Sequence, residues 1–165
     1  MNEILTGIVD AFFIGKNYGF LKDMKSGDSY FFFFDKKEQI GLSKKGEYPI
    51  SHIRKGDIIN YSLKESERKP KELQAYNFIF IENENVNQII TSIENGETRF
   101  GTVDKINDKL YLTDNKIEIT FPIKILFKEK NKFDINKILK SSKVEYFLEQ
   151  RKNPTKIFAK LKAND

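Results

Sequence analysis

The sequence contains no cysteine and no tryptophan, and its 165 residues include a single histidine. The lack of cysteine excludes disulfides, thiolate metal sites and thiol nucleophiles. The lone histidine, His52, has no second imidazole to share a metal ion or a proton with, and we expect it in a solvated loop. No apolar segment approaches the roughly 20 residues of a membrane span. The N-terminus shows no signal-peptide pattern, so we expect a cytoplasmic protein without a membrane partner.

Side chains that perform catalysis are not grouped in any pattern that enzymes use. The acidic residues are scattered, with no calcium-binding spacing, no paired carboxylates for acid–base work and no glycine-rich phosphate loop. The sequence therefore predicts no enzyme, no bound metal and no cofactor.

Positive charge is concentrated in the second half of the chain. The balance of Lys and Arg against Asp and Glu is +1 in residues 1–82, −3 in residues 83–98 and +7 in residues 99–165. An even spread of solvating lysines would also give a basic protein, but this asymmetry favours a polyanion near the second half.

Two aromatic clusters lie close together near the N-terminus, at residues 16–21 (KNYGFL) and 29–34 (SYFFFF). Because side chains alternate along a strand, each cluster projects two rings to one face, and the four rings are Tyr18, Phe20, Phe31 and Phe33. If the two strands pair, these rings and Lys16 form one patch. Exposed rings gathered in this way are typical of surfaces that stack the bases of single-stranded nucleic acid.

The chain also contains an internal echo. Residues 7–10 (GIVD) return as residues 101–104 (GTVD), and residues 59–63 (INYSL) are followed at a similar distance by residues 144–148 (VEYFL). The echoes come in the same order, with strand-like sequence between them. They favour a duplicated all-β unit whose second copy is shortened in its middle.

Alternation and turn residues predict five short strands in each copy. In the first copy they are residues 5–13, 18–23, 29–34, 57–64 and 72–81, and in the second 100–106, 109–114, 116–121, 143–150 and 155–161. Five such strands in about 80 residues predict a closed or nearly closed barrel. Residues 35–54 are expected to form a long polar loop. Apolar residues at helical spacing predict a short helix between the copies and another near Ile135.

The motifs of the first copy resemble the cold-shock domain family over about residues 4–80. That family carries Gly-x-Val, then Lys-Gly-Phe-Gly-Phe-Ile, then Val-Phe-Val-His-Phe, on a five-stranded barrel of the oligonucleotide-binding (OB) type. The resemblance implies that the chain binds single-stranded RNA or DNA, with RNA favoured, in the manner of an RNA chaperone. It places the stacking rings at Tyr18, Phe20, Phe31 and Phe33, two further rings at the platform's rim at Phe12 and Phe34, and a phosphate contact at Lys16.

Three departures from the family pattern bear on binding. Ala11 stands where the family has a tryptophan, Asn17 where it has a glycine, and Phe33 where it has a histidine. At about 1–3 kcal/mol per stacked base, the lost indole weakens binding by one to two powers of ten. Phe33 keeps a ring face but loses a hydrogen-bond donor, so we expect weaker base discrimination.

The fold prediction is an all-β protein with two tandem OB-type barrels, at residues 1–82 and 99–165, joined by a short acidic linker with helical spacing at residues 83–98. The second barrel is a degenerate cold-shock-like copy at about residues 99–163 with almost no ring platform. Two roles stay open for it: a protein partner, or a phosphate backbone met by lysines such as Lys105, Lys109, Lys116, Lys124 and Lys128. The alternative for the first barrel is that its rings form a protein interface, or serve a larger nucleic-acid-processing or translation assembly.

Overall fold

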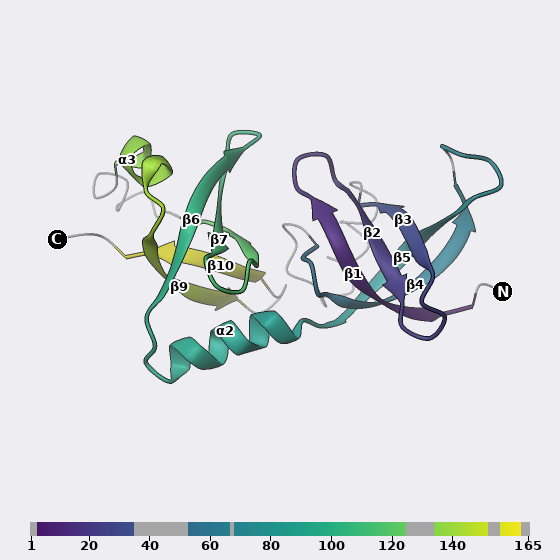
Figure 1. Cartoon of the computed structure of the whole chain (residues 1–165), viewed down its shortest axis with the longest axis horizontal. Helices are drawn as coiled ribbons and strands as arrows, with labels where there is room; N and C mark the ends of the chain where they lie inside the picture. The colour runs from purple at the N-terminus through teal and green to yellow at the C-terminus, as the bar shows by residue number, and fades with distance from the viewer. Residues whose placement is uncertain (1–2, 35–52, 67, 125–133, 152–155, 163–165) are drawn as a thin grey trace. The chain divides into compact units, whose positions relative to one another are not determined.

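A computed structural model describes residues 3–34, 53–66, 68–124, 134–151 and 156–162 (Figure 1). The chain divides into two compact units, the first extending to Glu84 and the second beginning at Asn85. The greater part of the predicted loop at residues 35–54, with His52, lies outside the described residues. No helix in the described part is both long and apolar enough to cross a membrane.

The first unit is a closed five-stranded barrel. Its strands are β1 (Leu5–Phe13), β2 (Tyr18–Asp23), β3 (Ser29–Phe33), β4 (Ile58–Glu65) and β5 (Leu73–Glu82). They pair in the order β1-β2-β3-β5-β4, and β4 closes the barrel by pairing with β1. All pairs are antiparallel except β3 with β5. This is the strand arrangement of an OB-type barrel, as predicted.

Alternation along each strand fills the barrel. Every second residue points inward, and the buried core comprises Val9, Leu21, Phe32, Phe34, Ile53, Ile59, Tyr61, Ala75 and Phe78. Gly19 lies where β1 and β2 come closest. A Cβ atom there would be 2.3 Å from the Ala11 carbonyl oxygen and 2.9 Å from the Phe32 ring, so a larger residue would push the two strands apart.

The second unit is a nearly closed barrel with the same plan. Its strands are β6 (Arg99–Ile106), β7 (Lys109–Asp114), β8 (Thr120–Pro122), β9 (Val144–Arg151) and β10 (Lys156–Leu161), in the order β10-β9-β6-β7-β8. A parallel bridge between Ile123 and Ala159 joins the two ends of this sheet, at the position of the parallel β3–β5 pair in the first barrel. The predicted two tandem five-stranded barrels are therefore confirmed.

Both predicted helices are present. Helix α2 (Glu84–Glu94) follows β5, and its buried Val86 and Ile89 belong to the core of the second unit. The predicted linker is thus a structural part of the second barrel. Helix α3 (Ile135–Lys140) lies between β8 and β9, and the side chain of Asp134 caps it by accepting a hydrogen bond from the backbone N–H of Lys137.

Strand β8 is shorter than predicted, because a turn replaces its first half. The Asp114 carboxylate accepts hydrogen bonds from the backbone N–H groups of Lys116 and Ile117, and Glu118 has a left-handed φ of 61°. A side chain that bonds its own backbone two and three residues on favours a turn over a strand.

Candidate functional site

The pairing of β2 with β3 brings the four predicted rings onto one face. Tyr18 lies opposite Phe33, and Phe20 lies opposite Phe31. Cross-strand partners project to the same side of a sheet, while the neighbouring Leu21 and Phe32 point into the core. The rings therefore stand on the outer face of the barrel.

The rings touch one another in a continuous row. The centroids of Tyr18 and Phe31 are 5.7 Å apart with the ring planes tilted by 33°, and those of Phe31 and Phe33 are 4.7 Å apart at 89°. Phe20 contacts Phe31 at 5.6 Å. A fifth ring, Phe13, lies 5.0 Å from Tyr18. We call this row of five, Phe13, Tyr18, Phe20, Phe31 and Phe33, the aromatic platform.

The platform is open to solvent within the first unit. Phe13 and Phe20 are 44% and 41% exposed, and the other three rings are half-buried because they pack against one another. None of the five belongs to the barrel core or to the partly buried residues that pack against it. Large rings with this exposure on a described surface are candidates for ligand contact.

Two predicted rim residues lie on the wrong side of the sheet. Phe34 is 1% exposed and belongs to the core, as alternation from Phe32 requires. Phe12 packs on the core as well: its ring is stacked on Phe32 at 6.0 Å with planes 5° apart and meets Phe34 edge-on. Both rings support the platform from inside the barrel, so we correct their assignment as rim residues.

A β-bulge explains why Phe13 replaces Phe12 on the outer face. The β1–β2 register shifts between Val9 and Ala11, so β1 has an extra residue there. One extra residue reverses the alternation that follows. Phe12 then pairs with the inward-facing Gly19, and Phe13 pairs with Tyr18 of the platform.

Cations border the platform. The guanidinium of Arg68, in the β4–β5 connection, lies 5.7 Å from the Phe31 centroid and 5.6 Å from the Phe33 centroid. These distances are within the range of cation–π interaction. Lys16 is exposed in the β1–β2 turn, beside Asn17, whose left-handed φ of 54° is one that asparagine tolerates. Asn17 therefore replaces the family's glycine without breaking the turn.

The outer face of the second barrel has a different composition. Thr113 and Thr120 face each other and share a hydrogen bond of 2.8 Å between their hydroxyl oxygens, and Tyr111 lies opposite Pro122. Tyr111 is itself only 7% exposed. Across the described residues, this face has no row of exposed rings.

The lysines predicted to meet phosphate are dispersed over the second unit. Lys105 lies 3.9 Å from Asp108 and Lys124 lies 3.3 Å from Glu149. Lys109, the first residue of β7, and Lys116, just after the end of β7, are exposed, and Lys128 lies outside the described residues. Lys105 and Lys109 lie near the turn of the β6–β7 hairpin, and Lys116 lies at the other end of β7.

No family model matches the sequence, and no curated protein matches it. The candidate site therefore depends on the residues and geometry described above.

Proposed function

We propose that the first barrel binds single-stranded nucleic acid, RNA in the first place, by stacking bases on the aromatic platform. One observation carries the proposal: five contacting rings stand on the outer face of an OB-type barrel, on three neighbouring strands, outside its core. Base–aromatic stacking tolerates any sequence because every base has a flat face. The motifs that resemble the cold-shock family support the same mode and an RNA-chaperone-like role.

The platform provides stacking positions that follow the strands. Successive outward residues on one strand are about 6.6 Å apart, a spacing that an extended strand of nucleotides can match. Phe20 and Phe31 form one end of the row and Phe13 with Tyr18 the other. Phe13 also adds a ring on β1, where Ala11 has removed the family's tryptophan.

The rings provide most of the binding free energy. The charge balance of residues 1–82 is only +1, so counterion release contributes little to binding by this unit. Arg68 lies over two of the rings, and we propose that it and the exposed Lys16 meet the phosphates between stacked bases.

The decisive experiment compares the full chain with the double variant Phe20→Ala/Phe31→Ala. Binding of fluorescein-labelled U-rich and dT oligonucleotides is measured by anisotropy. At ~1–3 kcal/mol per stacked base, the loss of two rings weakens binding about thirtyfold or more. A matched control is Phe147→Ala, which removes a ring that is 46% exposed in the second unit.

Fold integrity is checked by the dispersion of backbone amide NMR signals. If the double variant is folded and binds as tightly as the wild type, the platform is not the binding surface and the protein-interface alternative takes its place. If Phe147→Ala weakens binding equally, the effect is not specific to the platform. Comparing the U and dT oligonucleotides tests the preference for RNA.

A further inference from the structure

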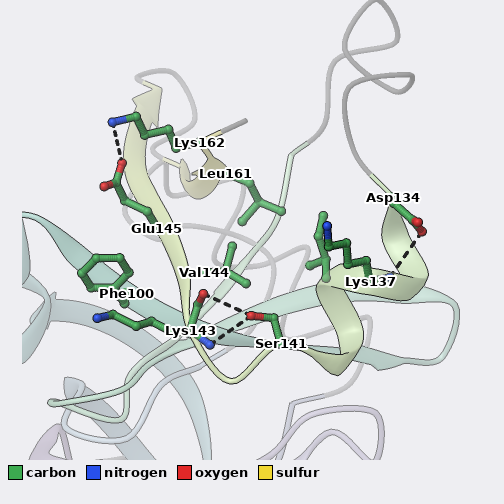
Figure 2. A pocket seen from close by; sticks show the side chains of 10 residues that line it. Phe100, Asp134, Lys137, Ser141, Lys143, Val144, Glu145, Leu161 and Lys162 are labelled. Atoms are coloured by element: carbon green, nitrogen blue, oxygen red, sulfur yellow. Dashed lines mark hydrogen bonds and ion pairs between the residues drawn. The ribbon is translucent and has the colours of Figure 1, made fainter. Parts of the chain in front are cut away.

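A concave site lies in the second barrel. It is a pocket of about 400 Å³ between β6, the start of β9, the end of β10 and helix α3 (Figure 2). Apolar side chains, Val144 and Leu161 among them, form part of its lining. Its size lies within the range of small-molecule sites.

Three lysines line this pocket. Lys137 comes from α3, Lys143 from the residue before β9 and Lys162 from the residue after β10. Figure 2 shows Lys143 beside Phe100 on one side of the pocket and Lys137 on α3 at the other. Lysines from chain segments far apart in sequence therefore line one cavity.

The two carboxylates of the pocket are already engaged. Glu145 forms an ion pair with Lys162, with 3.0 Å between its oxygen and the ammonium nitrogen. Asp134 accepts the backbone N–H of Lys137 as the cap of α3. Within the described part of the chain, neither carboxylate forms an ion pair with Lys137 or Lys143. Lys137 and Lys143 are thus not neutralised by an ion pair, and the lining as a whole has three lysines against two carboxylates, a net charge of +1.

Lys143 is held in place by its surroundings. Its backbone N–H donates to the Ser141 hydroxyl, and that hydroxyl donates to the Lys143 carbonyl. Its ammonium nitrogen lies 4.2 Å from the centroid of the Phe100 ring. The aromatic ring and the turn together fix the direction of this cation at the pocket's edge.

We propose that this pocket binds a phosphate group through Lys137 and Lys143. Lysine is a point-charge donor suited to phosphate oxygens, and the Glu145 carboxylate is already paired with Lys162. The ligand is either a small phosphate compound or the backbone of a nucleic-acid strand. This site lies in the second unit and shares no residue with the aromatic platform, so it does not depend on the proposed function of the first barrel.

The test titrates inorganic pyrophosphate into the full chain and follows backbone amide NMR signals. We expect shifts at Ser141, Lys143 and Val144. The double variant Lys137→Gln/Lys143→Gln should bind pyrophosphate about tenfold more weakly, because two solvent-exposed ion pairs are lost. The matched control is Lys22→Gln/Lys25→Gln, which removes two exposed charges outside the pocket, in the first barrel.

A second arm distinguishes the source of the phosphate. With a single-stranded oligonucleotide, the loss of the one phosphate held in the pocket should reduce the salt slope of log K by ~0.7 in the pocket variant if the backbone enters the pocket. An unchanged slope with weakened pyrophosphate binding assigns the pocket to a small phosphate compound.

Two results would overturn the proposal: pyrophosphate shifts that avoid the pocket, or equal losses in the pocket and control variants. The platform variant Phe20→Ala/Phe31→Ala separates the two proposals, since it should leave pyrophosphate binding unchanged.

Discussion

The two barrels have similar interiors and different outer faces. In the first, Gly7 pairs with Asp23, and the hydroxyl of Tyr61 donates to the Asp23 carboxylate at 2.5 Å. In the second, Gly101 pairs with Asp114, which accepts from Tyr146 at 2.6 Å. In both, the carboxylate also accepts two backbone N–H groups of the turn that follows. The glycine, carboxylate and tyrosine hold the same strand ends together.

The outer faces differ because the barrel does not depend on them. Phe20 and Phe31 pair on the first barrel, whereas the corresponding pair on the second is Tyr111 and Pro122. Inward positions must fill a fixed volume, so the duplicated plan keeps them apolar. Outward positions do not fill that volume, so their side chains can differ between the two barrels.

One interior position breaks the likeness. Leu5 pairs with Tyr61 in the first barrel, and Arg99 pairs with Tyr146 at the same place in the second. Arg99 donates to both carboxylate oxygens of Asp114, at 2.8 and 2.9 Å, and to the Ser92 hydroxyl of α2 at 3.1 Å. The second barrel therefore contains a buried ion pair where the first has a leucine.

The largest effect that separates the barrels is expected from replacing their aspartates. Asp114→Ala leaves the Arg99 guanidinium, whose side chain is only 10% exposed, without its counter-charge. Breaking a buried pair in this way costs about 3–5 kcal/mol. Asp23→Ala loses hydrogen bonds but leaves no guanidinium without a counter-charge, so it should lower the free energy of unfolding by about 1–3 kcal/mol.

The measurement is urea unfolding followed through amide NMR signals assigned to each barrel. Each variant should lower the midpoint of its own barrel. Equal losses in the two barrels would show that Arg99 makes no difference to the interior, and the comparison would fail at that position.

The stability of the second barrel should depend on pH because of the same ion pair. Burial raises the pKa of Asp114, but hydrogen bonds from Arg99, Tyr146 and two backbone amides outweigh burial and lower the pKa to about 2. A carboxyl whose pKa falls on folding stabilises the native state above its ordinary pKa near 3.8, and that stabilisation is lost as pH falls toward 2.

We therefore expect the stability difference between the wild type and Asp114→Asn to be complete above about pH 4 and to shrink toward pH 2. Thermal unfolding of the second barrel at a series of pH values measures it. A difference that stays constant down to pH 2 would mean that Asp114 keeps its ordinary pKa in the fold.

The sequence predicts the strands of both barrels well, because alternation is a local property. For the same reason it predicts which rings of β2 and β3 lie on the same face. Two features escape it. The bulge near Asp10 has no marker in the sequence, yet it exchanges the faces of Phe12 and Phe13. Arg68 reaches the platform from a distant connection, so only the closed barrel reveals it. Phe34 is a different case, since alternation places it inside and the family resemblance alone placed it at the rim.

The smallest expected effect tests the proposal that the rings, rather than the cations, provide most of the binding free energy of the first barrel. Arg68→Ala removes one cation from above Phe31 and Phe33. If Arg68 meets one phosphate, oligonucleotide affinity falls a few-fold and the salt slope of log K decreases by ~0.7. Anisotropy titrations of wild type and variant at several salt concentrations measure both quantities. Lys25→Ala serves as the control, because Lys25 is exposed in the β2–β3 turn, away from the platform. An unchanged slope with tighter binding would instead show that Arg68 competes with bases for the faces of the two rings. The cation would then weaken stacking on the platform.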